Sequence, residues 1–205
     1  MFIDEDHDSG REEAIQALLN NAMGKAGKSL EKVVDSIVEV NTPSTHWVNN
    51  NNLQVTLSGL SLPEQSIVMR QSFRGQLRGE MIILLEHGAK HYRLGKVMGY
   101  DDKMTTLNIQ ELTLELANIL SGACINGLSQ QLKIKLYFDS PSLISQQASV
   151  DQILASKHLR WTDALFMDVG YKVNSISMKT HLILSMVEED SHELYRLIDL
   201  QLEHQ

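Results

Sequence analysis

The stretch "ELTLELANILSG", residues 111–122, carries two polar residues, Glu115 and Asn118, one helical turn apart in a run rich in leucine. At 3.6 residues per turn, Glu111 and Gly122 fall on the same narrow stripe. A separate apolar stripe, about a quarter turn away, should face a core: Leu112, Leu116, Ile119 and Ala123. Asn is a poor helix former because its amide competes for backbone hydrogen bonds. We therefore expect a shallow, exposed helix face bearing a carboxylate and an amide, where Gly122 keeps the surface low.

Size and charge limit the class of protein. The chain has 205 residues, enough for one well-buried core, and a formal net charge of −8. The negative charge argues against nucleic acid or an anionic membrane as the main partner. No run of apolar residues reaches the length of a membrane span and no signal peptide is apparent, so the expected compartment is the cytoplasm. Cys124 is the only cysteine and is expected to be a small buried side chain.

Periodicity and turn residues predict the order of elements. Helices are expected at 12–40, 87–99, 107–132 and 190–205. Strands are expected at 53–57, 67–73, 80–86, 133–141, 164–173 and 178–187, with a hairpin connection at the glycines 75 and 79. Residues 41–52, which include Pro43 and the four consecutive asparagines 49–52, are typical of a loop, and residues 142–159 of a loop and a helix.

The two halves of the chain repeat. A shift of 98 positions places Glu13 on Glu111, Asn20 on Asn118 and Pro43 on Pro141, and "YRL" at 92–94 recurs at 195–197. A duplicated unit is the simplest explanation. We expect one α+β domain over residues 1–205, with repeat one at about 11–100 and repeat two at about 107–205. Its mainly antiparallel sheet should carry the two long helices on one face.

The spacing of Glu115, two residues, Asn118, twenty-two residues and Pro141 resembles the signature of the CheC/CheX/FliY phosphatases of bacterial chemotaxis. That signature is Asp or Ser, three residues, Glu, two residues, Asn, twenty-two residues and Pro. Residues 118–129 and 20–30 are similar to the two core helices of that family. Two positions depart from it. Glu111 stands where the family has Asp or Ser, and Ala17 replaces the glutamate of the first copy, so Glu13, Asn20 and Pro43 are expected to form a degenerate site.

The resemblance implies a substrate, the aspartyl phosphate of a CheY-like receiver domain. It implies that Asn118 orients the attacking water, that Glu115 pairs with the receiver's active-site lysine, and that Pro141 shapes the chain beside the site. No cofactor or metal of its own is expected, because the receiver supplies Mg²⁺. An amide suits the task, since it accepts from water and adds no negative charge beside a phosphoryl group.

Other interpretations stay open at this stage. The chain could be a binding module that grips a response regulator, or a CheD-like protein, without turnover. It could also be an adaptor in another two-component pathway, and it could be a monomer or a homodimer. His87 and His91 have the spacing of two metal ligands, but no third ligand accompanies them, and a surface position is expected for both.

Overall fold

A computed structural model describes residues 5–41, 44–49, 52, 55–56, 66–86, 89–100, 105–148, 152 and 163–203. Its helices are α1 (Glu5–Val34), α3 (Ala89–Val97), α4 (Thr106–Gln131) and α6 (Glu188–Leu202). Its strands are β1 (Val38–Val40), β2 (Ser44–Asn49), β3 (Ser66–Gly75), β4 (Gly79–Glu86), β5 (Leu136–Phe138), β6 (Ser142–Ala148), β7 (Asp163–Val173) and β8 (Ile176–Met186).

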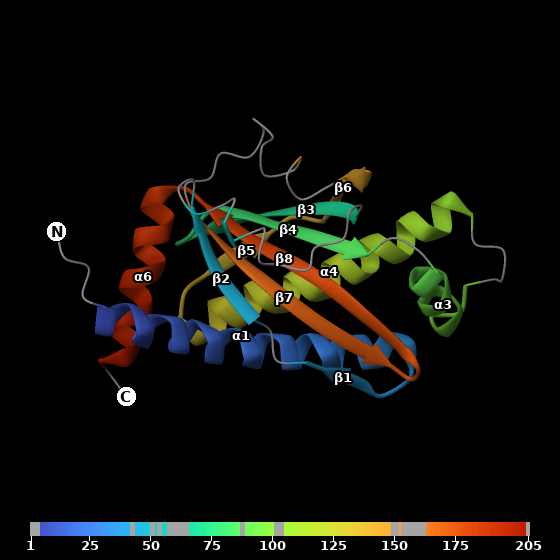
Figure 1. Ribbon diagram of the computed structural model, residues 1–205, viewed down its shortest axis with the longest axis horizontal. Helices are drawn as coiled ribbons and strands as arrows, with labels where there is room; N and C mark the ends of the chain where they lie inside the picture. Colours follow the sequence, from blue (N-terminus) through green and yellow to red (C-terminus); the bar gives the residue numbers. More distant parts are fainter. Residues whose placement is uncertain are drawn as a thin grey trace.

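One antiparallel sheet organises the described strands. Its order is β1-β7-β8-β4-β3-β5, with β2 also paired to β7 and β6 also paired to β3. The two long hairpins, β3–β4 and β7–β8, meet at the centre through β4 and β8. The helices α3 and α6 lie at opposite ends of the molecule (Figure 1). The expected fold class, α+β with a mainly antiparallel sheet, is confirmed.

The order helix, two short strands, long hairpin, helix occurs twice along the described chain. The short strands of each half pair with the long hairpin of the other half, because β1 and β2 join β7 while β5 and β6 join β3. Thr45 opposes Met167, and Leu143 opposes Met69. Both pairs are related by the same shift of 98 positions that relates the two halves of the sequence.

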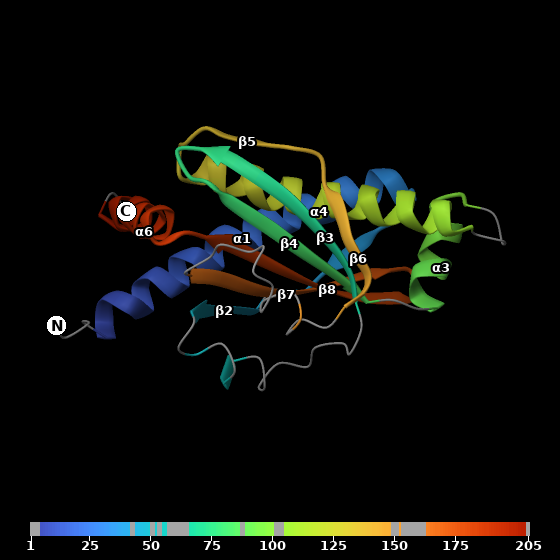
Figure 2. The ribbon, with the colours of Figure 1, turned by 90° about the horizontal axis from the view of Figure 1, so that it is seen from above.

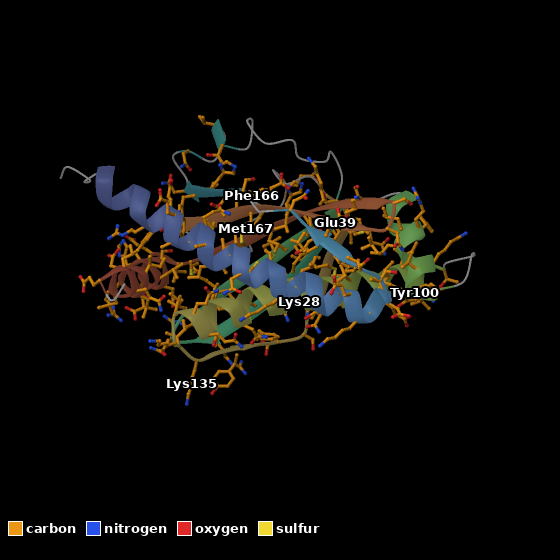
Figure 3. All side chains as sticks on the ribbon, turned by 90° about the horizontal axis from the view of Figure 1, so that it is seen from below. Lys28, Glu39, Tyr100, Lys135, Phe166 and Met167 are labelled. Atoms are coloured by element: carbon orange, nitrogen blue, oxygen red, sulfur yellow. The ribbon has the colours of Figure 1, made fainter. Side chains whose placement is uncertain are left out.

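The core lies between the sheet and the two long helices, which pack side by side on one sheet face (Figure 2). Alternate strand residues point into it, as the two-residue period of a strand requires. Phe166 and Met167, labelled in Figure 3, are consecutive in β7 and belong to opposite faces, and only Met167 joins this core. Its almost fully buried side chains include Leu19, Met23, Met69, Met81, Ile83, Leu85, Leu112, Leu116, Leu165 and Leu182.

The helices α1 and α4 pack closely where Gly127 of α4 faces Ala22 of α1. A Cβ at position 127 would overlap the Cβ of Ala22 and lie 3.2 Å from its Cα. Both atoms belong to or adjoin backbone, so neither can rotate away. The contact between the helices therefore depends on glycine at this position.

We expect Gly127→Ala to lower the free energy of unfolding by about 1–2 kcal/mol, since the overlap must be relieved by moving a helix. Gly24→Ala is the matched control, because Gly24 is an exposed helical glycine with no atom within 4 Å of the added Cβ. It should raise stability by roughly 0.5–1 kcal/mol through helix propensity. Denaturant titration of both variants measures the two changes in the free energy of unfolding. Equal effects would show that the helices do not meet here.

Residues 38–49 differ from the sequence-based prediction. Helix α1 ends at Val34, where Asp35 adopts a left-handed φ of 47°, and Val38–Val40 form strand β1 instead of a last helical turn. Ser44–Asn49, expected as a loop, form strand β2 opposite β7. The reason is non-local, because the pairing partner of β2 lies more than a hundred residues away. Pro43 is outside the described residues.

Two further predictions need correction or stay open. Residues 142–148, expected as loop and helix, form strand β6, which pairs with β3 through two register shifts. Of the strand expected at 53–57, Leu53 and Leu57 lie outside the described residues, and Val55 is helical rather than extended. The hairpin predicted around Gly75 and Gly79, the strands predicted at 164–173 and 178–187, and the long helix at 107–132 are confirmed to within a few residues.

Candidate functional site

Helix α4 presents the predicted polar stripe to solvent. Its first turn is fixed by a capping box, in which the Thr105 hydroxyl accepts from the Asn108 N–H and the Asn108 side chain accepts from the Thr105 N–H. Glu111, Glu115 and Asn118 are all exposed, while the opposite side of the helix is buried. The carboxylate of Glu115 and the amide of Asn118 thus project together into solvent from one side of α4, where another protein can approach them.

Gly122 does not leave an open surface, as the sequence had led us to expect. It is buried, and a Cβ there would meet the ring of Phe138 at 3.6 Å. Phe138 is the last residue of β5, so its ring lies over the glycine and fixes the start of the connection to β6. Pro141, the final residue of the motif, lies in this connection and is half-buried. The glycine therefore brings the connection close to Asn118.

Gln71 of β3 joins Asn118 to the same connection. Its Nε2 donates to the carbonyl oxygen of Asp139 (2.5 Å) and lies 3.4 Å from Oδ1 of Asn118. Its Oε1 accepts from the hydroxyl of Ser121, one turn along α4. Gln71 and Ser121 are fully buried, whereas Asn118 is exposed. The sequence analysis missed Gln71, although an amide between Met69 and Phe73 on the inward face of a strand is a recognisable irregularity.

Tyr100 is a second neighbour that the sequence analysis missed. It follows α3, and Figure 3 shows it at the same end of the molecule as that helix. Burial raises the pKa of its phenol above 10.0, and the charges of Glu115 and then Glu111 raise this pKa further. The phenol is therefore close enough for the charges of both carboxylates to affect its pKa. Nothing in the local sequence relates Tyr100 to α4.

We expect Glu115→Gln to lower the pKa of Tyr100, because removing a negative charge makes the tyrosinate less unfavourable. Glu111→Gln should lower it less, and Glu13→Gln, on the other long helix, should leave it unchanged. Since folding raises this pKa, Tyr100 stabilises the fold below pH 10, and this contribution is lost as the pH rises through its folded pKa. NMR titration of ¹³C-labelled tyrosine in the three variants checks this ranking of the changes in the Tyr100 pKa. No change in Glu115→Gln would contradict this proximity.

The corresponding face of α1 is arranged differently. Glu13, Ala17 and Asn20 are exposed, but Asn20 Oδ1 accepts from Gln16 Nε2 of the same helix at 3.1 Å. The side-chain oxygen Oε1 of Gln16 in turn accepts from the Thr45 hydroxyl at 2.9 Å. Glu13 and Ala17 border a hollow of about 320 Å³ between α1, α4 and α6. This face has no carboxylate one turn before its asparagine.

The remaining candidates are quickly described. Cys124 is buried, as predicted, and burial raises the pKa of its thiol to about 12, so it is unreactive in the folded protein. Within the described residues, no three His, Cys, Asp or Glu side chains gather as metal ligands. His87 and the side chain of His91 lie outside the described part. None of the described helices is long and apolar enough to cross a bilayer.

Comparison of sequences finds no matching family model and no matching curated protein. Comparison of structures finds several solved proteins with the same architecture. The chain resembles FliY from Thermotoga maritima with a TM-score of 0.67 and 14% identity over 97% of this chain and 98% of that one. The fold is that of the CheC/CheX/FliY family.

Two other structures show the breadth of that fold. The middle domain of FliM from H. pylori superposes with a TM-score of 0.61 at 11% identity, over 91% of this chain and 97% of that one. The chemotaxis protein CheX from Desulfovibrio desulfuricans superposes with a TM-score of 0.54 at 13% identity, over 82% and 99%. Identities this low establish the fold alone, so activity has to be argued from this chain's own residues.

Proposed function

We propose that this protein is a phosphatase that hydrolyses the aspartyl phosphate of a CheY-like receiver domain in chemotaxis or two-component signalling, with the cytoplasm as its compartment. The observation that supports this most strongly is the exposed pair of Glu115 and Asn118, one turn apart on α4. It matches two of the motif residues in type, spacing and accessibility. The pair projects into solvent from one side of a helix, which suits a substrate whose reacting group lies in a concave site.

Phosphoryl transfer leaves little covalent work for the protein. The receiver contributes the acyl phosphate, a lysine and Mg²⁺, which neutralise the transferred charge. What this chain adds is a positioned nucleophile. Asn118 accepts a hydrogen bond from a water molecule and holds it in line with the phosphorus. The water oxygen bonds to phosphorus as the bond to the aspartyl oxygen breaks, which releases aspartate and inorganic phosphate, and the water's protons stay on phosphate or pass to solvent.

Glu115 has a docking role in this proposal. An ionised carboxylate one turn from Asn118 can pair with the receiver's lysine through a charge-assisted hydrogen bond. That pair sets the depth and rotation at which α4 enters the receiver, and hence where the amide of Asn118 arrives. Positioning of this kind can lower a barrier by several kcal/mol, because it converts an encounter with bulk water into an intramolecular step. Pro141 shapes the connection beside Asn118, and Glu111 stays a surface residue.

A binding module is the competing proposal, and one observation favours it. Similar structures include FliM from H. pylori in complex with FliG and with SpeE, at TM-scores of 0.62 and 0.64 and identities of 9% and 8%. The same fold thus serves protein–protein binding. In this alternative, α4 would grip a response regulator, or the protein would bind a CheD-like partner, without accelerating hydrolysis.

The two proposals separate in one experiment. Receivers from the same cell are phosphorylated with a small-molecule phosphodonor, the donor is removed, and the decay of the phosphorylated form is followed with and without the protein. Binding is measured in parallel with the beryllofluoride-activated receiver. A phosphatase shortens the lifetime of at least one receiver that it binds. A binding module forms the complex and leaves the lifetime unchanged or lengthens it.

A further inference from the structure

Gln71 is a polar residue on a strand face that is otherwise apolar. Its neighbours on that face, Met69 and Phe73, join the core, and Gln71 itself is 0% exposed. Its contact on α4, Ser121, is also 0% exposed. Burying an amide and a hydroxyl costs free energy unless both are hydrogen-bonded. The Ser121 hydroxyl donates to Oε1 of Gln71. The NH₂ group of Gln71 reaches the Asp139 carbonyl and Oδ1 of Asn118.

The network fixes which way the Gln71 amide points. The Asp139 carbonyl can only accept, so the group facing it must be the NH₂ of Gln71. The second proton of that NH₂ then points at Asn118, which must present its oxygen, Oδ1, inward at 3.4 Å. As a result, Asn118 Nδ2 faces outward as a donor, and Oδ1 keeps one lone pair for a further partner. The orientation of the Asn118 side chain is thus set from inside the protein.

The asparagine of the first half, Asn20, has no equivalent buried polar pair at the positions related by the repeat. The positions that correspond to Ser121 and Gln71 by the 98-residue shift are Met23 and Val169, both fully buried and apolar. Asn20, the counterpart of Asn118, bonds only to the surface residue Gln16 among the contacts described above. The buried polar pair therefore lies beneath Asn118, which has Glu115 one turn away. Apolar residues lie beneath Asn20, which has no glutamate one turn before it. General packing needs do not explain this difference, because the apolar pair fills the equivalent place.

We propose that Gln71 is a positioning residue for the reaction at Asn118. By holding Oδ1 of Asn118, it keeps the amide in the one orientation that offers a lone pair to water and an N–H to a phosphate oxygen. Ser121 and the Asp139 carbonyl hold Gln71 in turn, because a fully satisfied polar network inside a protein is rigid. The expected effect on kcat rests on the proposed phosphatase function. The ordering of the Asn118 side chain by Gln71 does not.

The first test uses Gln71→Met, which keeps the length and bulk of the side chain but cannot donate. With a phosphorylated receiver that the wild-type protein dephosphorylates, kcat should fall about tenfold or more, since loss of orientation at the reacting group has effects of this order. KM and the affinity for the beryllofluoride-activated receiver should stay within about twofold of wild type. Val169→Ala, which perturbs the corresponding core position on the side of Asn20, should leave kcat unchanged. An unchanged kcat in Gln71→Met would overturn the proposal.

The second test does not depend on activity. The side-chain amide of Asn118 is assigned by its absence from the NMR spectrum of Asn118→Ala, and its order parameter is measured in wild type and Gln71→Met. We expect a clear fall in Gln71→Met and no change in Val169→Ala. An Asn118 amide that stays equally ordered would overturn the inference even if the receiver assay succeeded. A fall in order without any wild-type turnover would uphold the positioning contact and reject the phosphatase.

A variant that keeps the shape of the amide covers the case in which Gln71→Met does not fold. Gln71→Glu is isosteric, but its carboxylate cannot donate to Asp139 or Asn118. At neutral pH it should show the same loss of kcat and of Asn118 order. Both should recover in part as the pH falls and the buried carboxyl group is protonated, because it then regains one donor. No loss at neutral pH would contradict the proposal.

Discussion

Asn118→Ala should slow hydrolysis of the receiver's aspartyl phosphate on the order of a hundredfold while leaving the affinity for the receiver nearly unchanged. The expectation follows from the proposed division of roles. In the complex, the only receiver group that Asn118 contacts is a phosphate oxygen, beside the attacking water, and displacing a reacting group from its aligned position has effects of this size. Glu115 remains to dock the helix. Single-turnover decay of the phosphorylated receiver gives the rate, and titration of the beryllofluoride-activated receiver gives the Kd.

The chain contains its own control for this substitution. Asn20→Ala removes an exposed asparagine at the matched position of the other long helix, where Ala17 stands in place of a glutamate. It should change the rate by less than about twofold, within the usual range for a surface substitution. If Asn20→Ala abolished activity and Asn118→Ala did not, the working centre would lie on α1 instead of α4.

Glu115→Ala should weaken the complex, with a rise of about tenfold or more in the Kd for the activated receiver. Removing one partner of a charge pair that becomes buried on binding typically costs 2–5 kcal/mol or more. Hydrolysis at low receiver concentration should fall in parallel, because α4 no longer enters at a fixed depth. The affinity of wild type should fall with added salt, and that of Glu115→Ala should depend less on salt, since one ion pair is lost.

Glu111→Ala is the control for Glu115→Ala. Glu111 lies one turn earlier on the same exposed stripe and carries the same charge. If the effect of Glu115 were only a general electrostatic attraction to the receiver, both variants would lose affinity equally. A specific pair predicts that Glu111→Ala has the smaller effect. Surface plasmon resonance of both variants at two salt concentrations distinguishes these outcomes, and equal losses would remove the specific role of Glu115.

Part of the fold followed from the sequence because it depends on local periodicity. Helix α4 and the strands β3, β4, β7 and β8 have continuous apolar patterns, and their positions agree with expectation. The short strands β2 and β6 could not be recognised in this way. "STHWVN" and "SLISQQA" carry few apolar residues, and they are held in the sheet by β7 and β3, which are remote in the sequence.

The candidate site, too, could be predicted from the sequence only in part. The exposure of Glu115 and Asn118 on one stripe follows from the 3.6-residue period alone. The surroundings of Asn118 do not, because Gln71 reaches it from a strand 47 residues earlier and Tyr100 from the segment after α3. Gly122 had been interpreted as a gap in the surface, since the sequence does not reveal that Phe138 covers it. At the site, the contacts between elements were the part that sequence patterns did not predict.

Release of inorganic phosphate under multiple-turnover conditions tests the central claim most directly. The protein is added at one-hundredth of the concentration of a receiver that is continuously rephosphorylated by a small-molecule donor, and phosphate is measured over time. We predict steady release well above the receiver's intrinsic rate, proportional to the concentration of protein and lost in Asn118→Ala. Release at the intrinsic rate for every receiver that binds the protein would contradict catalysis and leave α4 as a binding surface.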